Sequence, residues 1–203
     1  MINNDLLYYI PSGEFGKEGV LGLLKTHPEI RFVSLVGIDL AGNDTDEKVP
    51  IELFLKNYDD FFAGTAVQTD GSSVVLMNIA TLNDARVDMV ADASVNWYID
   101  YNEDNLYSNG RPVGTLRIPC FLLHNGKFID SRSILKESCA FVAEKLKGLL
   151  ASGKPVKGME DLPVDEIEDI KFTIGTELEF WVKTPSETET VQHLSISQRL
   201  QEQ

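Results

Sequence analysis

The sequence predicts an α+β fold, in which short helices and antiparallel strand pairs follow one another along the chain. Three observations lead to this prediction. Apolar residues recur at helical spacing in some segments, they alternate with polar residues in others, and turn residues join the alternating segments into hairpins. The chain has 203 residues, 43% of them hydrophobic, which is enough to bury a core in one large domain or two small ones.

Two helices are predicted in the first third of the chain. Apolar residues recur at helical spacing within residues 12–27, where Ser12 is a suitable N-cap. This helix is expected to end at His27, because the residue before a proline is disfavoured in the helical region. Residues 51–62 carry enough apolar side chains for a second, packed helix.

Strand patterns lie between and after these helices. Residues 31–39 show an alternating pattern, and residues 47–51 give a shorter return strand after the turn residues Ala41-Gly42-Asn43. Together these segments predict a hairpin. Two further strands are predicted over residues 74–80 and 95–99.

The middle of the chain predicts a break and then a second hairpin. Residues 100–112 are rich in Asn, Asp, Gly and Pro, which indicates a long loop or a domain boundary. Residues 115–123 and 127–129 flank the dipeptide Asn125-Gly126. An Asn-Gly pair between apolar runs is a strong hairpin signal.

The last two predicted elements are a long helix and a strand. Residues 131–150 have the clearest helical spacing in the chain, with Ser131 or Ser133 available as N-cap. Residues 171–183 alternate and predict a final strand with one strongly apolar face. Such a strand needs partners on that face, so we expect the chain to be a truncated part of a larger protein.

Composition restricts the function. The formal net charge is −14, and nucleic acids favour clustered Lys and Arg, so we do not expect nucleic acid as a partner. A divalent metal can still bridge an acidic site to nucleotide phosphates. Two cysteines are too few for a disulfide framework, and three widely spaced histidines give no metal-ligand spacing. With no signal peptide and no membrane-spanning stretch, we expect a cytoplasmic protein.

The main candidate for chemistry is Glu177 and Glu179 in the sequence Gly-Thr-Glu-Leu-Glu-Phe-Trp. Side chains on a strand alternate, so the two carboxylates share a face with Cα atoms roughly 6.6–7 Å apart. That spacing suits two neighbouring metal ions, and oxygen ligands favour Mg²⁺ or Mn²⁺. The alternative is a strand with a solvated acidic face, which is the commoner use of this pattern.

Three weaker candidates precede this strand. Asp70-Gly71-Ser72-Ser73 predicts a loop that presents a carboxylate and a hydroxyl to a ligand, or an ordinary turn. Acidic residues recur at four-residue intervals at Asp84, Asp88 and Asp92. This spacing predicts either an acidic site or a solvated face. Asp130-Ser131-Arg132-Ser133 fits a capped helix start.

In this order the motifs resemble those of the glutamine synthetase family. The resemblance covers residues 30–183 and is carried by five segments: Phe32–Gly42, Asp70-Gly71-Ser72-Ser73, Asn83-Asp84 with Asp92-Ala93-Ser94, Asp130–Lys136, and Gly175–Trp181. It implies a β-grasp domain over residues 1–110, followed over residues 111–203 by the incomplete start of an antiparallel-sheet catalytic domain.

The resemblance also implies an activity, the amidation of glutamate by ammonia through a γ-glutamyl phosphate made from ATP. Glu177 and Glu179 would bind Mg²⁺ or Mn²⁺. Asp70 and Ser73 would act on the ammonia site of a neighbouring subunit, and Asp84 would be a further substrate-binding position. The family implies a homo-oligomeric ring, a dodecamer or a decamer.

The chain departs from the family pattern at several positions. Met77 replaces a tryptophan, Ser131 replaces a proline, and the remaining metal and substrate ligands are not among the 203 residues. We therefore expect this fragment alone to be inactive. Two alternatives stay open: a γ-glutamyl ligase for another amine, and a non-catalytic β-grasp regulatory or interaction module.

Overall fold

The computed structural model describes residues 5–13, 16–76, 85–154, 157–158, 167–177, 179, 182–183 and 191–192. It divides into two compact units, Met1–Leu146 and Lys147–Gln203. The division at residue 110 that the family resemblance implies stays a prediction. Within the described ranges, none of the helices combines the length and apolar character needed to cross a bilayer.

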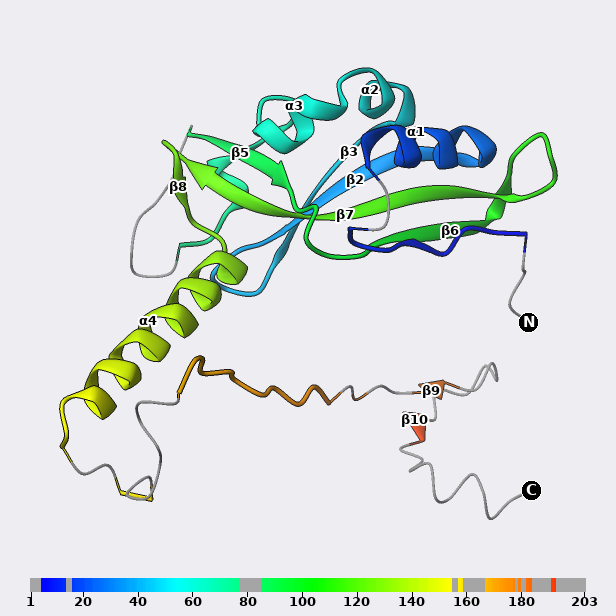
Figure 1. Ribbon diagram of the computed structural model, residues 1–203. Helices are drawn as coiled ribbons and strands as arrows, with labels where there is room; N and C mark the ends of the chain where they lie inside the picture. The colour runs from blue at the N-terminus through cyan, green and yellow to red at the C-terminus, as the bar shows by residue number, and fades with distance from the viewer. Residues whose placement is uncertain are drawn as a thin grey trace, which may run out of the picture. The chain divides into compact units, whose positions relative to one another are not determined.

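The first unit is a mixed α/β structure built on a largely antiparallel sheet (Figure 1). The order of its central strands is β1-β6-β7-β2-β3, while β5 and β8 also pair with β7, and β4 pairs with β5. The strands are β1 (Tyr9–Ile10), β2 (Ile30–Ile38), β3 (Asp44–Pro50), β4 (Gln68–Asp70), β5 (Arg86–Ala91), β6 (Trp97–Leu106), β7 (Pro112–His124) and β8 (Lys127–Phe128).

Strand β7 organises the sheet because it pairs with four others. Its first part pairs with β6 in antiparallel and with β2 in parallel orientation, and its last part pairs with β5 and β8. The β2–β7 pair is the parallel exception in the described sheet. Alternate residues of β7 point into the core and are fully buried: Leu116, Ile118, Cys120 and Leu122.

Helices α1 (Lys17–Thr26), α2 (Ile51–Lys56) and α3 (Tyr58–Ala63) lie along one face of this sheet (Figure 1). Leu24, Phe54 and Phe61 are buried between the helices and the strands. The Phe54 and Phe61 rings meet edge to face, with centroids 5.0 Å apart. Burial of such side chains is the main favourable term in folding, and it fixes the helical layer on the sheet.

Both predicted hairpins are confirmed. Strands β2 and β3 pair in register from Phe32↔Pro50 to Ile38↔Asp44. Strands β7 and β8 are joined by Asn125 and Gly126, which both have positive φ, 49° and 72°. Positive φ at both central residues is the geometry of a type I′ turn, which asparagine and glycine tolerate best.

Helix α4 (Ser131–Ala151) confirms the longest predicted helix, but its cap is Asp130 and neither serine. The Asp130 Oδ1 atom accepts a hydrogen bond from the Ser133 backbone N–H at 2.8 Å, which is N-cap geometry. Its Oδ2 atom accepts one from the Leu122 backbone N–H at 3.0 Å. Asp130 is fully buried, so it attaches the start of α4 to strand β7.

Several predictions for the first unit are wrong in their bounds. The first helix begins at Lys17, after Gly16, with no side-chain cap at Ser12. The helix predicted over residues 51–62 is broken at Asn57 into α2 and α3. Strand β6 continues to Leu106 through residues expected to form a loop, because its charged side chains point to solvent and do not oppose strand pairing.

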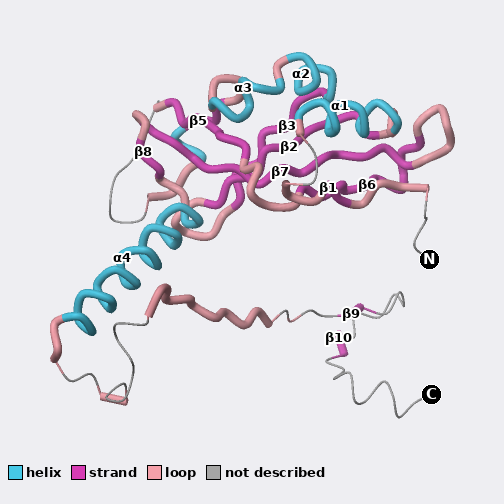
Figure 2. Tube along the Cα trace, viewed as in Figure 1, coloured by secondary structure: helices cyan, strands magenta, loops and turns pink. Residues whose placement is uncertain are grey.

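The second unit departs further from expectation. The strand predicted over residues 171–183 is not formed at residues 171–177, which have no regular secondary structure (Figure 2). Two-residue strands β9 (Val182–Lys183) and β10 (Val191–Gln192) pair in antiparallel orientation. A strand requires a hydrogen-bonded partner, and no strand in the described ranges pairs with residues 171–177. The strand predicted over residues 74–80 lies partly outside the described residues.

Candidate functional site

Asp70 ends strand β4 and begins a short 3₁₀ turn, Gly71–Ser73. The Asp70 Oδ1 atom accepts a hydrogen bond from the Ser72 backbone N–H at 2.7 Å. The carboxylate is exposed, and hydrogen bonds from the Ser72 side chain and backbone lower its pKa below the ordinary value. The predicted Asp-Gly-Ser-Ser loop therefore presents an ionised carboxylate to its surroundings.

This loop is attached to the β2–β3 hairpin on one side and to β5 on the other. The Val75 backbone N–H donates to Asp39 Oδ2 at 2.9 Å, and the Thr45 hydroxyl donates to the Ser73 carbonyl oxygen at 3.2 Å. The Gly71 backbone N–H donates to the Ala85 carbonyl oxygen at 2.7 Å. Hydrogen bonds from both sides fix the backbone that carries Asp70.

Asp39 is the principal anchor of this arrangement, and the sequence reading assigned it no role of its own. Its fully buried carboxylate accepts bonds from the Ala41 and Asn43 backbone N–H groups, both at 2.9 Å, as well as from Val75. Burial alone would raise the pKa of Asp39, but the hydrogen bonds from Val75, Asn43 and Ala41 outweigh it and lower the pKa. Asp39 is therefore a buried, charged hub that joins the hairpin turn to the chain after Asp70.

The other predicted site residues differ in their position and burial. Ser73 shares the loop with Asp70, and its side chain is exposed while its carbonyl oxygen is bonded to Thr45. Asp84 lies outside the described residues. Of its spacing partners, Asp88 accepts a bond from Gln68 Nε2 at 2.6 Å across the β4–β5 pair, and Asp92 is buried.

Glu177 and Glu179 belong to the second unit, where both are exposed and lie outside any strand. Their predicted placement on one face of a strand is therefore not formed. Among the described residues, no three His, Cys, Asp or Glu side chains are grouped so as to hold a metal ion. A metal site at Glu177 and Glu179 stays a prediction.

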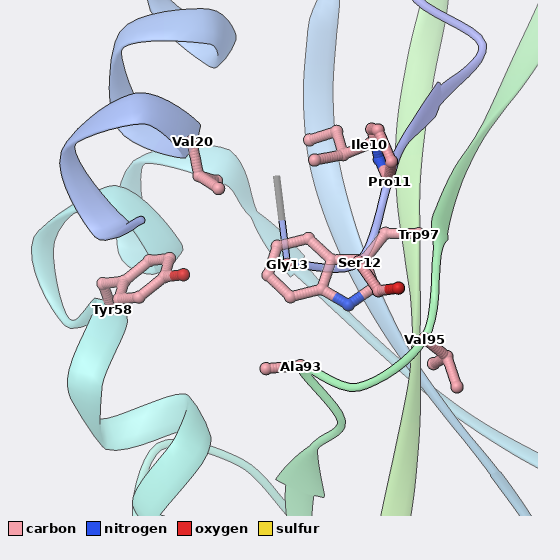
Figure 3. A pocket seen from close by; sticks show the side chains of 9 residues that line it. All are labelled: Ile10, Pro11, Ser12, Gly13, Val20, Tyr58, Ala93, Val95 and Trp97. Atoms are coloured by element: carbon pink, nitrogen blue, oxygen red, sulfur yellow. The ribbon is translucent and has the colours of Figure 1, made fainter. Parts of the chain in front are cut away.

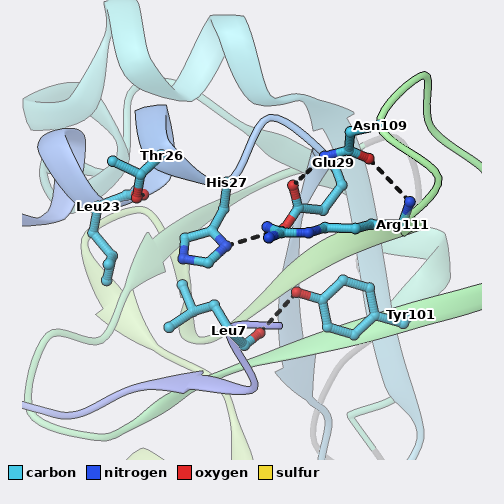
Figure 4. Close-up of polar contacts among 8 residues, drawn as sticks. All are labelled: Leu7, Leu23, Thr26, His27, Glu29, Tyr101, Asn109 and Arg111. Atoms are coloured by element: carbon cyan, nitrogen blue, oxygen red, sulfur yellow. Dashed lines mark hydrogen bonds and ion pairs between the residues drawn. The ribbon is translucent and has the colours of Figure 1, made fainter. Parts of the chain in front are cut away.

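A buried network around Glu29 joins two turns at one end of the sheet (Figure 4). Its side chain is fully buried and bonds to His27 Nδ1 at 3.0 Å, Asn109 Nδ2 at 3.1 Å and Arg111 Nη1 at 3.2 Å. Burial acts to raise the pKa of Glu29, but bonds from its own backbone, His27, Asn109 and Arg111 lower it. Three side chains bond the Glu29 carboxylate, so we assign Glu29 a structural role.

Figure 3 shows a small pocket between α1, α3 and the strands. Its walls include Ile10, Val20, Tyr58 and Trp97, and its volume is about 40 Å³. That space accepts water molecules but is far smaller than the pockets of about 300–1,000 Å³ that bind metabolites. We assign it no substrate.

Comparison with known proteins finds similarity among solved structures. No protein-family model matches the chain, and no curated protein matches it. Among solved structures, the chain is similar to a Plasmodium falciparum glutamine synthetase studied by cryo-electron microscopy, with a TM-score of 0.45 and 18% sequence identity. The match covers 66% of this chain but only 24% of that chain. A likeness at this level adds nothing to the functional argument, which has to come from the residues.

Proposed function

We propose that this chain is the amino-terminal part of a glutamine synthetase-like ligase. In this proposal residues 1–110 form a β-grasp domain, and residues 111–203 begin an antiparallel-sheet catalytic domain. The support is the order of the motifs along the chain, from the hairpin at residues 32–42 to the Glu177-Leu178-Glu179 sequence.

Within this proposal, the Asp70 loop would supply the ammonium site. In this proposal the exposed Asp70 carboxylate, which has a lowered pKa and lies on a backbone bonded to Asp39 and Thr45, would bind a small cation. Ammonium is such a cation. Because the lowered pKa makes Asp70 a weak base, we assign it mainly to the electrostatic binding and orientation of ammonium and only secondarily to accepting its proton.

The remaining chemistry needs ATP and a divalent metal. Glu177 and Glu179 would bind Mg²⁺ or Mn²⁺ through their carboxylates, and the metal would neutralise charge while ATP phosphorylates the γ-carboxylate of glutamate. Asp70, Ser73 and Asp84 would act at the site of the next subunit in a homo-oligomeric ring. The complete protein would work in the cytoplasm.

The direct test is to express the whole reading frame that encodes this chain and to measure glutamine formation from glutamate, ammonium and ATP. We expect metal-dependent turnover, and we expect Asp70→Asn to lower kcat/KM for ammonium by about 100-fold or more, the usual range for a positioned catalytic side chain. Asp44→Asn is the matched control, because Asp44 is an exposed aspartate at the start of β3.

The same assay separates the alternatives. Turnover with a polyamine but not with ammonium would assign the protein to the ligases for other amines. No ATP consumption with any amine, in a folded protein, would contradict the enzyme proposal and favour the regulatory or interaction module.

A further inference from the structure

Two motifs to which the proposed function gives no chemical role meet at the start of α4. The buried Asp92 follows strand β5, and Arg132 lies in the first turn of α4. Arg132 Nη2 donates to Asp92 Oδ2 at 2.5 Å. Ser94 donates to Asp92 Oδ1 through both its backbone N–H, at 2.8 Å, and its hydroxyl, at 2.6 Å. Segments 40 residues apart in sequence are thereby joined.

An open concavity of about 350 Å³ lies beside this pair, entirely within the first unit. Its size is within the range of about 300–1,000 Å³ that is typical of pockets for small ligands. The residues that line it are Asp92, Ser94, Phe121, Arg132, Leu135 and Lys136.

Two residues of the lining, Arg132 and Lys136, are cationic. A guanidinium group has five N–H donors, and Arg132 uses one of them for Asp92 in the described part of the chain. Its Nη1 atom is buried there without a hydrogen-bond partner. Lys136, one helical turn further on, is exposed and has no ion pair with another described residue. With Asp92 counted, the lining carries one net positive charge in a chain of net charge −14.

Phe121 and Leu135 add apolar surface to the lining. The Phe121 ring packs under the Arg132 guanidinium, 5.0 Å from its carbon Cζ, and meets the Phe128 ring edge to face. Leu135 is 55% exposed on α4. An apolar surface beside cationic side chains matches a ligand with one charged end and one flat apolar end.

We propose that this concavity binds a small organic anion in which one carboxylate is joined to an apolar ring. The carboxylate would be held by the exposed ammonium group of Lys136, with the positive charge of Arg132 beside it, and the ring would lie beside Phe121 and Leu135. A single carboxylate fits better than a more highly charged anion, because Asp92 leaves only one net positive charge. This site is independent of the proposed amidation chemistry.

Benzoate is the probe for this proposal, with the 203-residue chain observed by ¹H–¹⁵N NMR. We expect saturable shifts of the Phe121, Leu135 and Lys136 amide signals. Benzyl alcohol, which has a similar shape and no charge, should bind at least about tenfold more weakly, because it lacks the charge-assisted hydrogen bonds.

Two charge reversals on the same helix give the specificity control. Lys136→Glu should raise the Kd for benzoate at least about fivefold, whereas Lys145→Glu, which lies beside Phe141 outside the concavity, should change it by less than about twofold. Both lysines are exposed, so both variants should fold. The proposal is overturned if benzoate shifts none of the three signals, if benzyl alcohol binds equally well, or if the two variants weaken binding to the same extent.

Discussion

The Asp70 loop and the segment at Glu177 both present exposed carboxylates, but the chain supports them in different ways. The loop lies between paired strands, and its backbone is bonded to the buried Asp39 and to Thr45. Residues 171–177 have no regular secondary structure, and each side chain in this range is exposed. A carboxylate on a loop is positioned when buried groups bond the loop backbone, whereas a carboxylate on a strand is positioned only when the strand has a partner.

The largest effect on stability is expected when Asp39, the anchor of the Asp70 loop, is removed. Asp39→Ala leaves the N–H groups of Ala41, Asn43 and Val75 without their buried acceptor. Because the substitution removes three hydrogen bonds to a buried carboxylate, we expect a loss of about 3 kcal/mol in the free energy of unfolding, measured by urea denaturation.

Asp44→Ala is the control for this experiment, since Asp44 is exposed on the same hairpin. It should change the free energy of unfolding by less than about 0.5 kcal/mol. Equal effects of the two substitutions would show that Asp39 is not an anchor.

The pH dependence of stability tests whether the buried Asp39 is ionised. The folded state lowers the pKa of Asp39, so its ionised form stabilises the protein above the unfolded-state pKa of about 3.9. The stability advantage of the wild type over Asp39→Asn should therefore be full at pH 6 and should shrink as pH falls below about 4. Urea midpoints of both proteins between pH 7 and pH 3 measure this; a difference that stays constant would argue against an ionised Asp39.

A smaller effect is expected from the second support of the loop. Thr45→Val removes the hydroxyl that donates to the Ser73 carbonyl oxygen and should lower the free energy of unfolding by about 1 kcal/mol. Thr115 is buried in β7 without a side-chain hydrogen bond to another described residue, so Thr115→Val should cost less. A larger loss for Thr115→Val than for Thr45→Val would show that the Thr45 hydroxyl does not stabilise the loop.

The smallest effect is expected in the second unit. Ile174 is 72% exposed, so Ile174→Asn should change the free energy of unfolding by less than about 0.5 kcal/mol. Ile118→Ala, in the buried part of β7, should cost about 3 kcal/mol in the same denaturation series. A large effect at Ile174 would mean that residues 171–177 are packed in solution.

Elements defined by local chemistry could be predicted from the sequence. The β7–β8 hairpin depends on Asn125-Gly126, and α4 depends on regular apolar spacing after Asp130. Elements defined by distant partners could not be predicted. Strand β6 continues past Asp100 because β7 supplies its hydrogen bonds, and the sequence around Asp100 looks like a loop.

The same distinction applies to the candidate site. The turn at Asp70 was predicted from its residue types, and the Asp39–Asn43 spacing carries a local signal for an aspartate that bonds its own turn. The Val75 bond to Asp39 spans 36 residues, and the Arg111 bond to Glu29 spans 82. No local pattern contains those pairings, so the sequence does not predict that Asp39 and Glu29 join distant segments.

Amide hydrogen exchange on the 203-residue chain is the most direct test of the central claim, that the backbone of the Asp70 loop is held by hydrogen bonds while residues 171–177 have no strand partner. We predict that the Ser72 and Val75 amides, which bond Asp70 and Asp39, are slowed at least about 100-fold relative to an unstructured chain. Amides of residues 171–177 should exchange within a few-fold of the unstructured rate. Equal protection in the two regions, or greater protection of residues 171–177, would contradict the account.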